Sequence, residues 1–418
     1  MIRIRNGRVT GIGDRRPGAT ELQVTLDDED GEVDAISYDQ LTGPVAVGDR
    51  VVLNTTAVAL GLGTGGFHVV MARLGGPVDA PGPGHVIKAR YTPSQVRVLA
   101  VEEEGSPHRA AVAACSGLDG LPVVCAELHS MVPVVAAAAR AVADDLAVAY
   151  VMTDGGALPL AFSRLAAELR AGGLVAGTIT AGQAFGGDLE AISLYSALAA
   201  ARVVLAADVV VVAQGPGGMG SGTAFGFSGT QVAEAVNAVG ALGGRPVACL
   251  RLSAADRRSR HRGVSHHSLT ALGRLALARS AVAVPELADP ELAALVDRQL
   301  AEAGVAGRHD LHRVATPEPA KLLAAWGLQV TSMGRGPEED PVFFAAAAAA
   351  GTLAGRLARS CEDSWPGAAT RRCSRPAWPG WSPGSGCSWS CPWRRGSWSC
   401  TSSPPPATST SRSGPRGR

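Results

Sequence analysis

Two stretches of this sequence concentrate residue types that bind anions. The first, "GPGGMGSGTAFGFSGT" (residues 215–230), has seven glycines in sixteen residues and follows the apolar run "ADVVVVAQ". The second, "DRRSRHRGVSHHS" (residues 256–268), has four arginines and three histidines in thirteen residues. Glycine lets the backbone approach a ligand and turn successive amides toward it, and guanidinium groups supply compensating charge. The two stretches therefore predict a site for a phosphate- or carboxylate-bearing small molecule.

Each stretch also has an interpretation without a ligand, as a flexible surface loop and as a solvated charged loop. We favour binding because the basic stretch lies in an otherwise mildly acidic body, follows an apolar strand and leads into a helix with Ser265 as its N-cap. The residues that we expect to bind the anion are Gly215, Gly217, Gly220, Ser221, Thr223, Gln183, Asp188, Arg260, Arg262 and His267.

Gly215, Gly217 and Gly220 also satisfy the G-x-G-x-x-G pattern that holds a dinucleotide after a strand. The context departs from a dinucleotide site in two respects. "TAFGFSG" separates the third glycine from the next helix, and Arg251 stands near the end of the next strand where an acidic residue is expected. We therefore assign no nicotinamide cofactor, and the cofactor stays unknown.

Asp154, His129 and His266 are the candidates for acid/base catalysis, because carboxylate and imidazole groups are the usual proton donors and acceptors. The same three residues could instead bind a metal in a metal-dependent hydrolase, although no H-E-x-x-H spacing supports that alternative. On a helix, His266 and the adjacent His267 point about 100° apart, so we expect one ion to use only one of them. The metal is left unknown. No nucleophile or phosphate-loop motif occurs in the sequence.

The candidate residues lie in a segment, residues 121–360, where short apolar strands alternate with amphipathic helices. "LPVVCAEL" is followed by "MVPVVAAAARAVADD", and the alternation continues to an alanine-rich helix after Asp340. Such alternation builds βαβ units and a parallel sheet, and strands that are apolar on both faces need helices on both sides. The sequence predicts an α/β protein whose larger domain is a doubly wound parallel sheet, Rossmann-like in type.

Residues 1–105 predict a small all-β domain, a barrel or a sandwich, because short β-prone runs alternate there with Gly, Pro and Asp turns. Residues 106–120 read as a linker between the two domains.

Ligands of a parallel sheet bind beyond the carboxyl ends of its strands. The segments that follow the expected strands are rich in polar residues and glycine. We therefore expect a single crevice to be lined by residues 127–130, 153–156, 180–188, 214–223 and 253–267.

Residues 361–418 differ in composition from the rest of the chain. They contain eight arginines, six tryptophans and five cysteines but no Leu, Ile, Val, Met, Phe, Tyr or Lys. Such a segment lacks the apolar pattern of a core, so we predict disorder and interpret it as an out-of-frame translation. The alternative is a Cys/Trp-rich metal module, although its cysteine spacings match no zinc pattern.

The remaining composition favours a soluble, cytoplasmic protein. The N-terminus carries no secretory signal pattern, and the apolar runs are shorter than the ~18 residues of a membrane span. Cys115, Cys125 and Cys249 form no C-x-x-C pair, which fits buried thiols in a reducing compartment. The acidic body argues against nucleic acid as a partner. We expect neither nucleic acid nor membrane, and homo-oligomerisation is left open.

Several stretches together resemble an uncharacterised bacterial family catalogued as domain of unknown function 3866. The resemblance covers most of residues 1–358 and assigns no activity, because the family has none. It implies that the body of the protein extends to about residue 358 and that the tail is foreign to it. The stretches that carry the resemblance are "LNTTAVALGLGTGGFHVVMA", "VMTDGGALPLAFSRL", "GTITAGQAFGGDLEA", "VVVVAQGPGGMGSGTAFGFSG", "RHRGVSHHS" and "TSMGRGPEEDPVFFAAAAAAG".

The function expected from these observations is an enzyme of unassigned class acting on an anionic small molecule at the carboxyl ends of the sheet. The alternative is a ligand-sensing or scaffolding protein with the same pocket and no chemistry. Neither composition nor spacing names the substrate or the reaction.

Overall fold

The computed structural model of the protein describes residues 1–79 and 82–363. Residues 364–418, on which most of the expectations for the tail fall, lie outside this description. Within it, the chain forms a small β-barrel and a large parallel sheet covered by helices, and both belong to one contact unit. The prediction of an α/β protein with a small N-terminal all-β part is confirmed.

Five of the N-terminal β-prone runs close into a barrel in the order β1-β2-β3-β5-β4. Alternate side chains along these strands point inward, as the two-residue period of a strand requires. Val24, Val51 and Leu53 are buried in the centre. The strands are β1 (Ile4–Arg16), β2 (Ala19–Leu26), β3 (Glu32–Tyr38), β4 (Arg50–Asn54) and β5 (His68–Leu74), with the short helices α1 (Asp39–Thr42) and α2 (Thr56–Ala59) between them.

The last two β-prone runs form a separate pair, β6 (Val86–Lys88) and β7 (Val96–Val98). Val96 and Val98 pack against Phe185 of the α/β part instead of entering the barrel. Helix α3 (Arg109–Ala113) follows, within the segment expected to be a linker.

All eight strands of the large sheet run parallel, in the order β11-β10-β9-β12-β8-β13-β16-β17. The chain enters at β8, moves to one edge, returns through β12 between β9 and β8, and then continues to the other edge. The strands are β8 (Pro122–Cys125), β9 (Val148–Thr153), β10 (Gly177–Thr180), β11 (Leu189–Glu190), β12 (Val209–Gln214), β13 (Arg245–Cys249), β16 (Ala281–Pro285) and β17 (Asp310–Val314).

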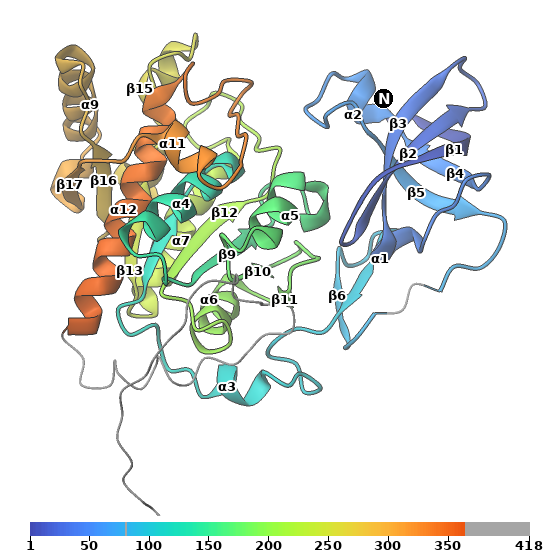
Figure 1. The fold of residues 1–418 in the computed structure, drawn as a ribbon, viewed down its shortest axis with the longest axis horizontal. Helices are drawn as coiled ribbons and strands as arrows, with labels where there is room; N and C mark the ends of the chain where they lie inside the picture. The colour runs from blue at the N-terminus through green and yellow to red at the C-terminus, as the bar shows by residue number, and fades with distance from the viewer. Residues whose placement is uncertain (80–81, 364–418) are drawn as a thin grey trace, which may run out of the picture. The chain divides into compact units, whose positions relative to one another are not determined.

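Helices cover both faces of this sheet because its strands are apolar on both sides (Figure 1). Along β12, Val209 and Val211 belong to one core, and Val210 and Val212 belong to the other. One face carries α4 (Val132–Val142), α5 (Arg164–Ala171), α11 (Pro319–Ala324) and α12 (Pro341–Asp363). The other carries α6 (Leu194–Val203), α7 (Gln231–Ala241), α8 (His266–Thr270), α9 (Pro290–Glu302) and α10 (Val305–Arg308).

Helix α12, drawn orange-red in Figure 1, packs along α4. Small residues allow this close contact. A Cβ on Gly351 would lie 2.2 Å from the carbonyl oxygen of Val135, so glycine is required for this approach. By length and composition Pro341–Ser360 could span a membrane, which the sequence analysis did not anticipate. However, 72% of that stretch is buried inside the protein, as in a core helix.

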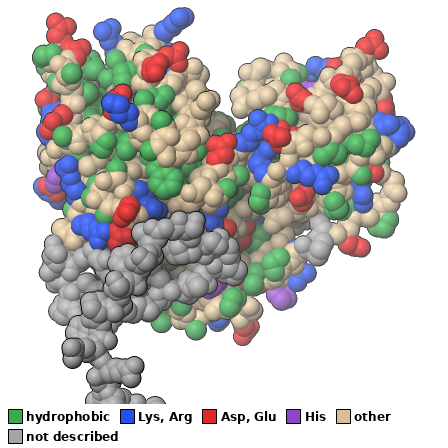
Figure 2. All heavy atoms as spheres, viewed as in Figure 1, with side chains coloured by type: hydrophobic (Ala, Val, Ile, Leu, Met, Phe, Trp, Pro, Cys, Tyr) green, Lys and Arg blue, Asp and Glu red, His purple; other side chains and the backbone are tan. Residues whose placement is uncertain are grey.

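Acidic and basic side chains are interspersed over the surface in Figure 2, with no continuous basic area on that face.

Candidate functional site

Polar side chains that leave the carboxyl ends of four neighbouring strands meet at the middle of the sheet. The pairing register places the ends of two of these strands side by side, because Gln214 at the end of β12 pairs with Thr153 at the end of β9. The loop after β8 brings Glu127, and the loop after β13 brings Arg251. Loops after β8 and β9 lead to one face of the sheet and loops after β12 and β13 to the other. The connections therefore diverge at the point where sheets of this type have their ligand-binding crevice.

Glu127 lies at the centre of a buried charged network. Its Oε1 accepts hydrogen bonds from Nη1 of Arg251, at 2.8 Å, and from Nδ1 of His267, at 2.6 Å. Burial raises the pKa of the Glu127 carboxyl, but the hydrogen bonds and charges of His267 and Arg251 outweigh burial and hold that pKa below its usual value. Glu127 is therefore an ionised acceptor for both partners.

His261, His266 and His267 form a cluster. A ring nitrogen from each residue lies within 4.8 Å of those of the other two. The sequence expectation that adjacent His266 and His267 would diverge is wrong, because their ring centroids are 4.3 Å apart. The 100° separation describes the Cα–Cβ bonds of successive residues in a helix. His266 and His267 are the first two residues of α8, directly after the N-cap Ser265, and there the side chains bring the two rings together.

His261 reaches this cluster because the basic stretch folds back on itself. Strand β14 (Leu252–Ser253) pairs antiparallel with β15 (Gly263–Val264), so the intervening residues return to the start of α8. Burial and the charges of Arg251 and Arg258 lower the pKa of His261 to about 3. Burial also lowers the pKa of His266, and the charge of His267 adds to the effect. Both rings are therefore neutral near pH 7.

The glycine stretch lies against this histidine cluster. Phe227 stacks on the His267 ring with centroids 4.0 Å apart and planes 1° from parallel. A Cβ on Gly220 would lie 3.3 Å from the His267 ring, and one on Gly222 would lie 3.7 Å from the Arg260 guanidinium. The structure thus brings the glycine stretch and the basic stretch together at the ends of the strands.

The hydroxyl groups of the glycine stretch are used within the stretch itself. Ser221 Oγ lies 2.8 Å from Thr223 Oγ1 and donates to the carbonyl of Gly226 at 2.9 Å. Gly220 and Phe227 pair as an isolated antiparallel bridge. These bonds shape a small exposed hairpin. Ser221 and Thr223 therefore hold the loop in shape.

Gly215 and Gly217 serve different purposes in this stretch. A Cβ on Gly215 would lie 2.4 Å from the carbonyl oxygen of Ala157, so Gly215 permits close packing on the loop after β9. Gly217 has a φ of +86° and nothing within 4 Å of its Cβ position, so it has open space around it. Gly217 is thus the glycine that leaves room for a ligand.

Asp154 and Gln183 lie together beside the glycine stretch. The backbone N–H of Gln183 donates to Asp154 Oδ2 at 2.9 Å, and the side-chain Nε2 of Gln231 donates to Asp154 Oδ1 at 3.3 Å. The same loop is tied to the glycine stretch, because the amide of Ala157 donates to the carbonyl of Pro216 at 2.7 Å. Asp154 thus accepts from the loop after β10 and from the first residue of α7.

Two residues expected at the site are used elsewhere. His129 has both ring nitrogens engaged, Nδ1 with the Tyr150 hydroxyl at 2.9 Å and Nε2 with Ser163 Oγ at 2.7 Å. Burial lowers its pKa to about 4. Asp188 accepts from the Thr178 amide at 2.8 Å and from Arg170 Nε at 2.8 Å, at the start of β10. Both residues fix local structure.

A metal set made of His129, Asp154 and His266 does not form. Among the residues that the structure describes, the His/Cys/Asp/Glu group at metal-binding distances consists of His261, His266 and His267. The two hydrogen bonds at His129, one at each ring nitrogen, explain why its ring is not available to this set.

The helix expected after Ser265 is shorter than predicted. Ser265 is the N-cap, and its Oγ accepts from the His267 amide at 3.2 Å. However, α8 ends at Thr270 and continues as one π-helical turn, Ala271–Leu275. A wide turn of this kind disrupts the regular hydrogen-bond ladder. So short a helix has little dipole, and the charge for an anion must come from arginine.

Arg260 and Arg262 are both exposed, and the charge of Arg260 acts on His266 in the cluster. Within residues 1–79 and 82–363, neither guanidinium has an ion-pair partner. By contrast Arg258, in the same stretch, is paired with Asp256 at 2.8 Å. Arg257 is also exposed without an ion pair among the described residues, but Arg260 is the arginine of this stretch that lies beside the glycine stretch, at Gly222.

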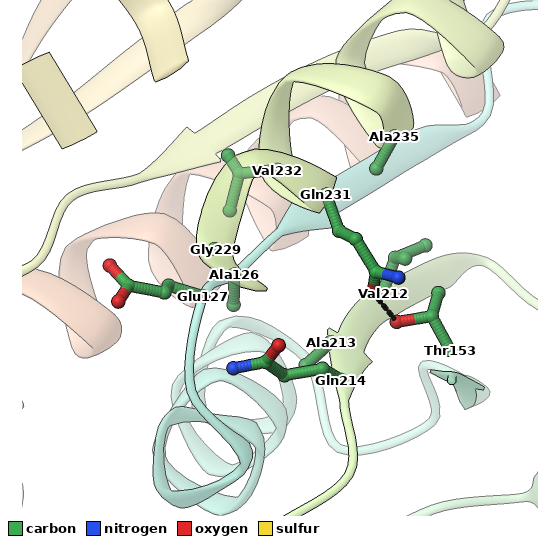
Figure 3. A pocket seen from close by; sticks show the side chains of 10 residues that line it. All are labelled: Ala126, Glu127, Thr153, Val212, Ala213, Gln214, Gly229, Gln231, Val232 and Ala235. Carbon is green, nitrogen blue, oxygen red and sulfur yellow. Dashed lines mark hydrogen bonds between the residues drawn. The ribbon is translucent and has the colours of Figure 1, made fainter. Parts of the chain in front are cut away.

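A small cavity lies between the ends of β9 and β12 and the start of α7 (Figure 3). Its volume is about 10 Å³, which is the space of a single water molecule. Thr153 donates to Gln231 at its wall, whereas the carboxylate of Glu127 points away from these two residues (Figure 3). A ligand therefore needs the outer side of the site, where the glycine stretch lies.

Glu127, Arg251 and His261 were given no catalytic or ligand-binding role in the sequence interpretation, although each followed an expected strand or lay in the basic stretch. The signal that could have identified Glu127 and Arg251 is a charged residue directly after an otherwise apolar strand. His261 gave no such signal, because only the β14–β15 pairing places it beside His266.

One of the three comparisons with known proteins gives a match. No curated protein and no solved structure matches the chain. The sequence model of a family described as "Protein of unknown function (DUF3866)" matches residues 34–351. The match spans barrel strands, the whole glycine stretch, the basic stretch and half of α12. The chain therefore belongs to the DUF3866 family of proteins of unknown function.

Proposed function

We propose that this protein is an enzyme acting on an anionic small molecule, one that carries a phosphate or a carboxylate, bound beyond the carboxyl ends of the parallel sheet. The observation that carries the proposal is the contact between the glycine stretch and the basic stretch. Gly220 and Phe227 lie on His267, and Gly222 lies beside Arg260. Two segments suited to anions thus face each other at the crevice where such sheets bind ligands.

Arg260 and Arg262 bind the anion, and the backbone of residues 215–223 covers it. Each charge-assisted hydrogen bond stabilises the complex by about 1.5–3 kcal/mol. The open surroundings of Gly217 leave the space that such a ligand needs. The exposed guanidinium groups need no rearrangement of existing ion pairs to make these bonds.

His266 is the general base, and Asp154 is a second candidate. The Nε2 atom of His266 is buried and has no hydrogen-bond partner among the described groups. The lowered pKa of His266 leaves its ring neutral. In that state Nε2 is proposed to carry the lone pair that accepts a substrate proton. Asp154 accepts two hydrogen bonds, at 2.9 and 3.3 Å, that a substrate could replace.

We further infer that the larger part of the chain is Rossmann-like in type and that the protein works in the cytoplasm. Helices on both faces and a site at strand ends support the first inference. The second is supported by the free thiols of Cys115, Cys125 and Cys249 and by the burial of α12.

A thermal-shift screen of the full chain against phosphate- and carboxylate-bearing metabolites tests the binding. We expect a set of related anions to raise the unfolding temperature of the wild type and of Arg257→Ala, an exposed control in the same stretch, but not of Arg260→Ala. Stabilisation by uncharged ligands alone, or equal shifts in all three proteins, would contradict the proposal.

A non-catalytic ligand-sensing or scaffolding role is the second candidate, and the water-sized cavity favours it because no enclosed substrate pocket is formed there. Incubation of each stabilising metabolite with the protein, followed by mass spectrometry, separates the two. An enzyme converts the metabolite and loses turnover in Asp154→Asn and His266→Gln. A sensor returns it unchanged and keeps its affinity in both variants.

A further inference from the structure

We propose that His261, His266 and His267 bind a divalent transition-metal ion, with Glu127 orienting His267. This inference goes beyond the proposed anion site and does not depend on it. When an ion is bound, Nε2 of His266 is its ligand, and Asp154 is then the candidate general base. It starts from the cluster in which one ring nitrogen of each histidine lies within 4.8 Å of the others.

Glu127 determines which nitrogen of His267 is available. An ionised carboxylate only accepts hydrogen bonds, so the proton of the 2.6 Å bond is on Nδ1 of His267. The nitrogen of His267 that faces away from this bond, Nε2, is then the one left to an ion. A carboxylate behind a metal-binding histidine is the usual arrangement at such centres, because it fixes the tautomer and raises the basicity of the ligand.

The other two rings offer nitrogens in a compatible way. Nδ1 of His261 lies 2.8 Å from Ser265 Oγ, an oxygen that can accept this proton together with the one from the His267 amide. That tautomer leaves Nε2 of His261 to the ion. Nε2 of His266 is buried without a partner among the described residues. Buried polar atoms are nearly always paired, so this unpartnered nitrogen indicates a missing ligand.

The spacing suits a metal after small movements. In a tetrahedral zinc site with Zn–N bonds near 2.1 Å, the ligand nitrogens lie about 3.4 Å apart. The histidine nitrogens here are within 4.8 Å, and rotation of the rings closes the difference. Three imidazoles favour zinc, cobalt, nickel or copper over magnesium or calcium, and they leave a coordination position open.

The surrounding charges favour an anion as the additional ligand. Glu127 offsets one positive charge, but Arg251 contacts the same carboxylate and Arg260 lies beside Gly222. Arg258 is neutralised by Asp256. A dication next to two guanidinium groups is stabilised when hydroxide or an anionic group completes its coordination.

Cobalt(II) alone is the probe for this site in the full chain. The cysteines of residues 361–418 are competing ligands, and cobalt distinguishes them because thiolate ligation produces a near-ultraviolet charge-transfer band. We expect one equivalent of cobalt to give visible d–d absorption without that band, and excess zinc to remove the absorption.

Variants assign the site to the histidines. We expect His266→Ala, which removes a half-buried ring, to weaken cobalt binding more than about tenfold, and Glu127→Gln to weaken it about 10–100-fold. His261→Ala and His267→Ala should behave alike if circular dichroism shows that they fold. His312→Ala, an exposed histidine on β17, is the matched control and should bind like the wild type.

Three results would overturn the proposal. They are no d–d absorption at millimolar cobalt, d–d absorption that never occurs without the thiolate charge-transfer band, and unchanged cobalt affinity in folded His266→Ala. The anion proposal is tested separately, because thermal shifts by metabolites in the presence of a chelator do not require the metal.

Discussion

Glu127 Oε1 lies 2.6 Å from Nδ1 of His267, although the two residues are 140 positions apart in the chain. The contact joins the end of β8 to the start of α8. Arg251 completes it from the end of β13 at 2.8 Å. Three segments thus depend on one carboxylate, which is 4% exposed. A buried network of this kind is stable only when every member is paired.

Loss of Glu127 should therefore destabilise the whole fold. In Glu127→Ala the Arg251 guanidinium is left buried without its partner, which costs about 3–5 kcal/mol. Glu127→Gln keeps the shape and one acceptor, so a smaller loss is expected. Urea unfolding followed by circular dichroism measures both variants. Equal stability of Glu127→Ala and the wild type would show that the network contributes nothing.

Arg260 should bind the anion more strongly than its neighbours in sequence. Arg260→Ala loses one charge-assisted bond, so we expect affinity for a phosphate-bearing ligand to fall about tenfold or more. Binding to the wild type should also weaken as salt rises, because the ions screen the charges. Calorimetry of Arg260→Ala, Arg262→Ala and the control Arg257→Ala checks this. Equal losses in Arg260→Ala and Arg257→Ala would point to non-specific attraction.

Gly217→Val should abolish ligand binding while the protein stays folded. The φ of +86° costs a valine about 1–2 kcal/mol of strain, and the side chain occupies the open space around Gly217. Gly243→Val is the control, because Gly243 has a φ of +68° and also nothing within 4 Å, but it follows α7 away from the site. Thermal unfolding should show similar losses in both variants, with binding lost only in Gly217→Val. Retained binding in Gly217→Val would mean that the ligand lies elsewhere.

Lys88, one of two lysines in the chain, should be essential for docking the β6–β7 pair on the sheet. Its buried Nζ donates to the carbonyls of Thr180 and Ala184, at 2.9 and 2.6 Å, and to Glu190 at 2.7 Å. Lys88→Met leaves the Glu190 charge buried, which costs about 3–5 kcal/mol. Lys88→Met/Glu190→Gln should recover part of that loss in urea unfolding. No recovery in the double variant would contradict the ion-pair explanation.

Stability should fall in acid through Glu21 on β2. Hydrogen bonds from Arg164 lower the pKa of Glu21 below 4.5; burial opposes them and Arg16 adds to them. A carboxyl with a lowered folded-state pKa stabilises the protein above its unfolded pKa and loses that contribution as pH falls through the folded value. Between about pH 5 and 3, Glu21→Gln should therefore show a flatter decline in unfolding temperature than the wild type. The control is Glu104→Gln, an exposed carboxylate with no ion pair among the described residues. A decline as steep in Glu21→Gln as in the wild type would exclude Glu21 as the cause.

Local pattern predicted the strands of the large sheet and its long helices. The runs of apolar residues in β12, the helical spacing in α7 and α9, and the glycines between elements each depend on neighbours in the sequence, so their positions could be predicted. The parallel sheet followed from the alternation of strands and helices, because a crossover connection permits little else. The meeting of residues 215–223 with the basic stretch followed from the rule that loops at strand ends share one edge.

The order of the strands and the partners of each polar group depended on the tertiary structure. The sequence does not state that β12 lies between β9 and β8, yet this placement sets Gln214 beside Thr153 and opens the crevice. His129 looked like a catalytic base until Tyr150 and Ser163 took both its nitrogens. His261 joined the histidine cluster only through the β14–β15 pairing. Residue types set what chemistry this chain can offer, whereas hydrogen bonds and ring contacts between distant segments decide which groups remain free to perform it.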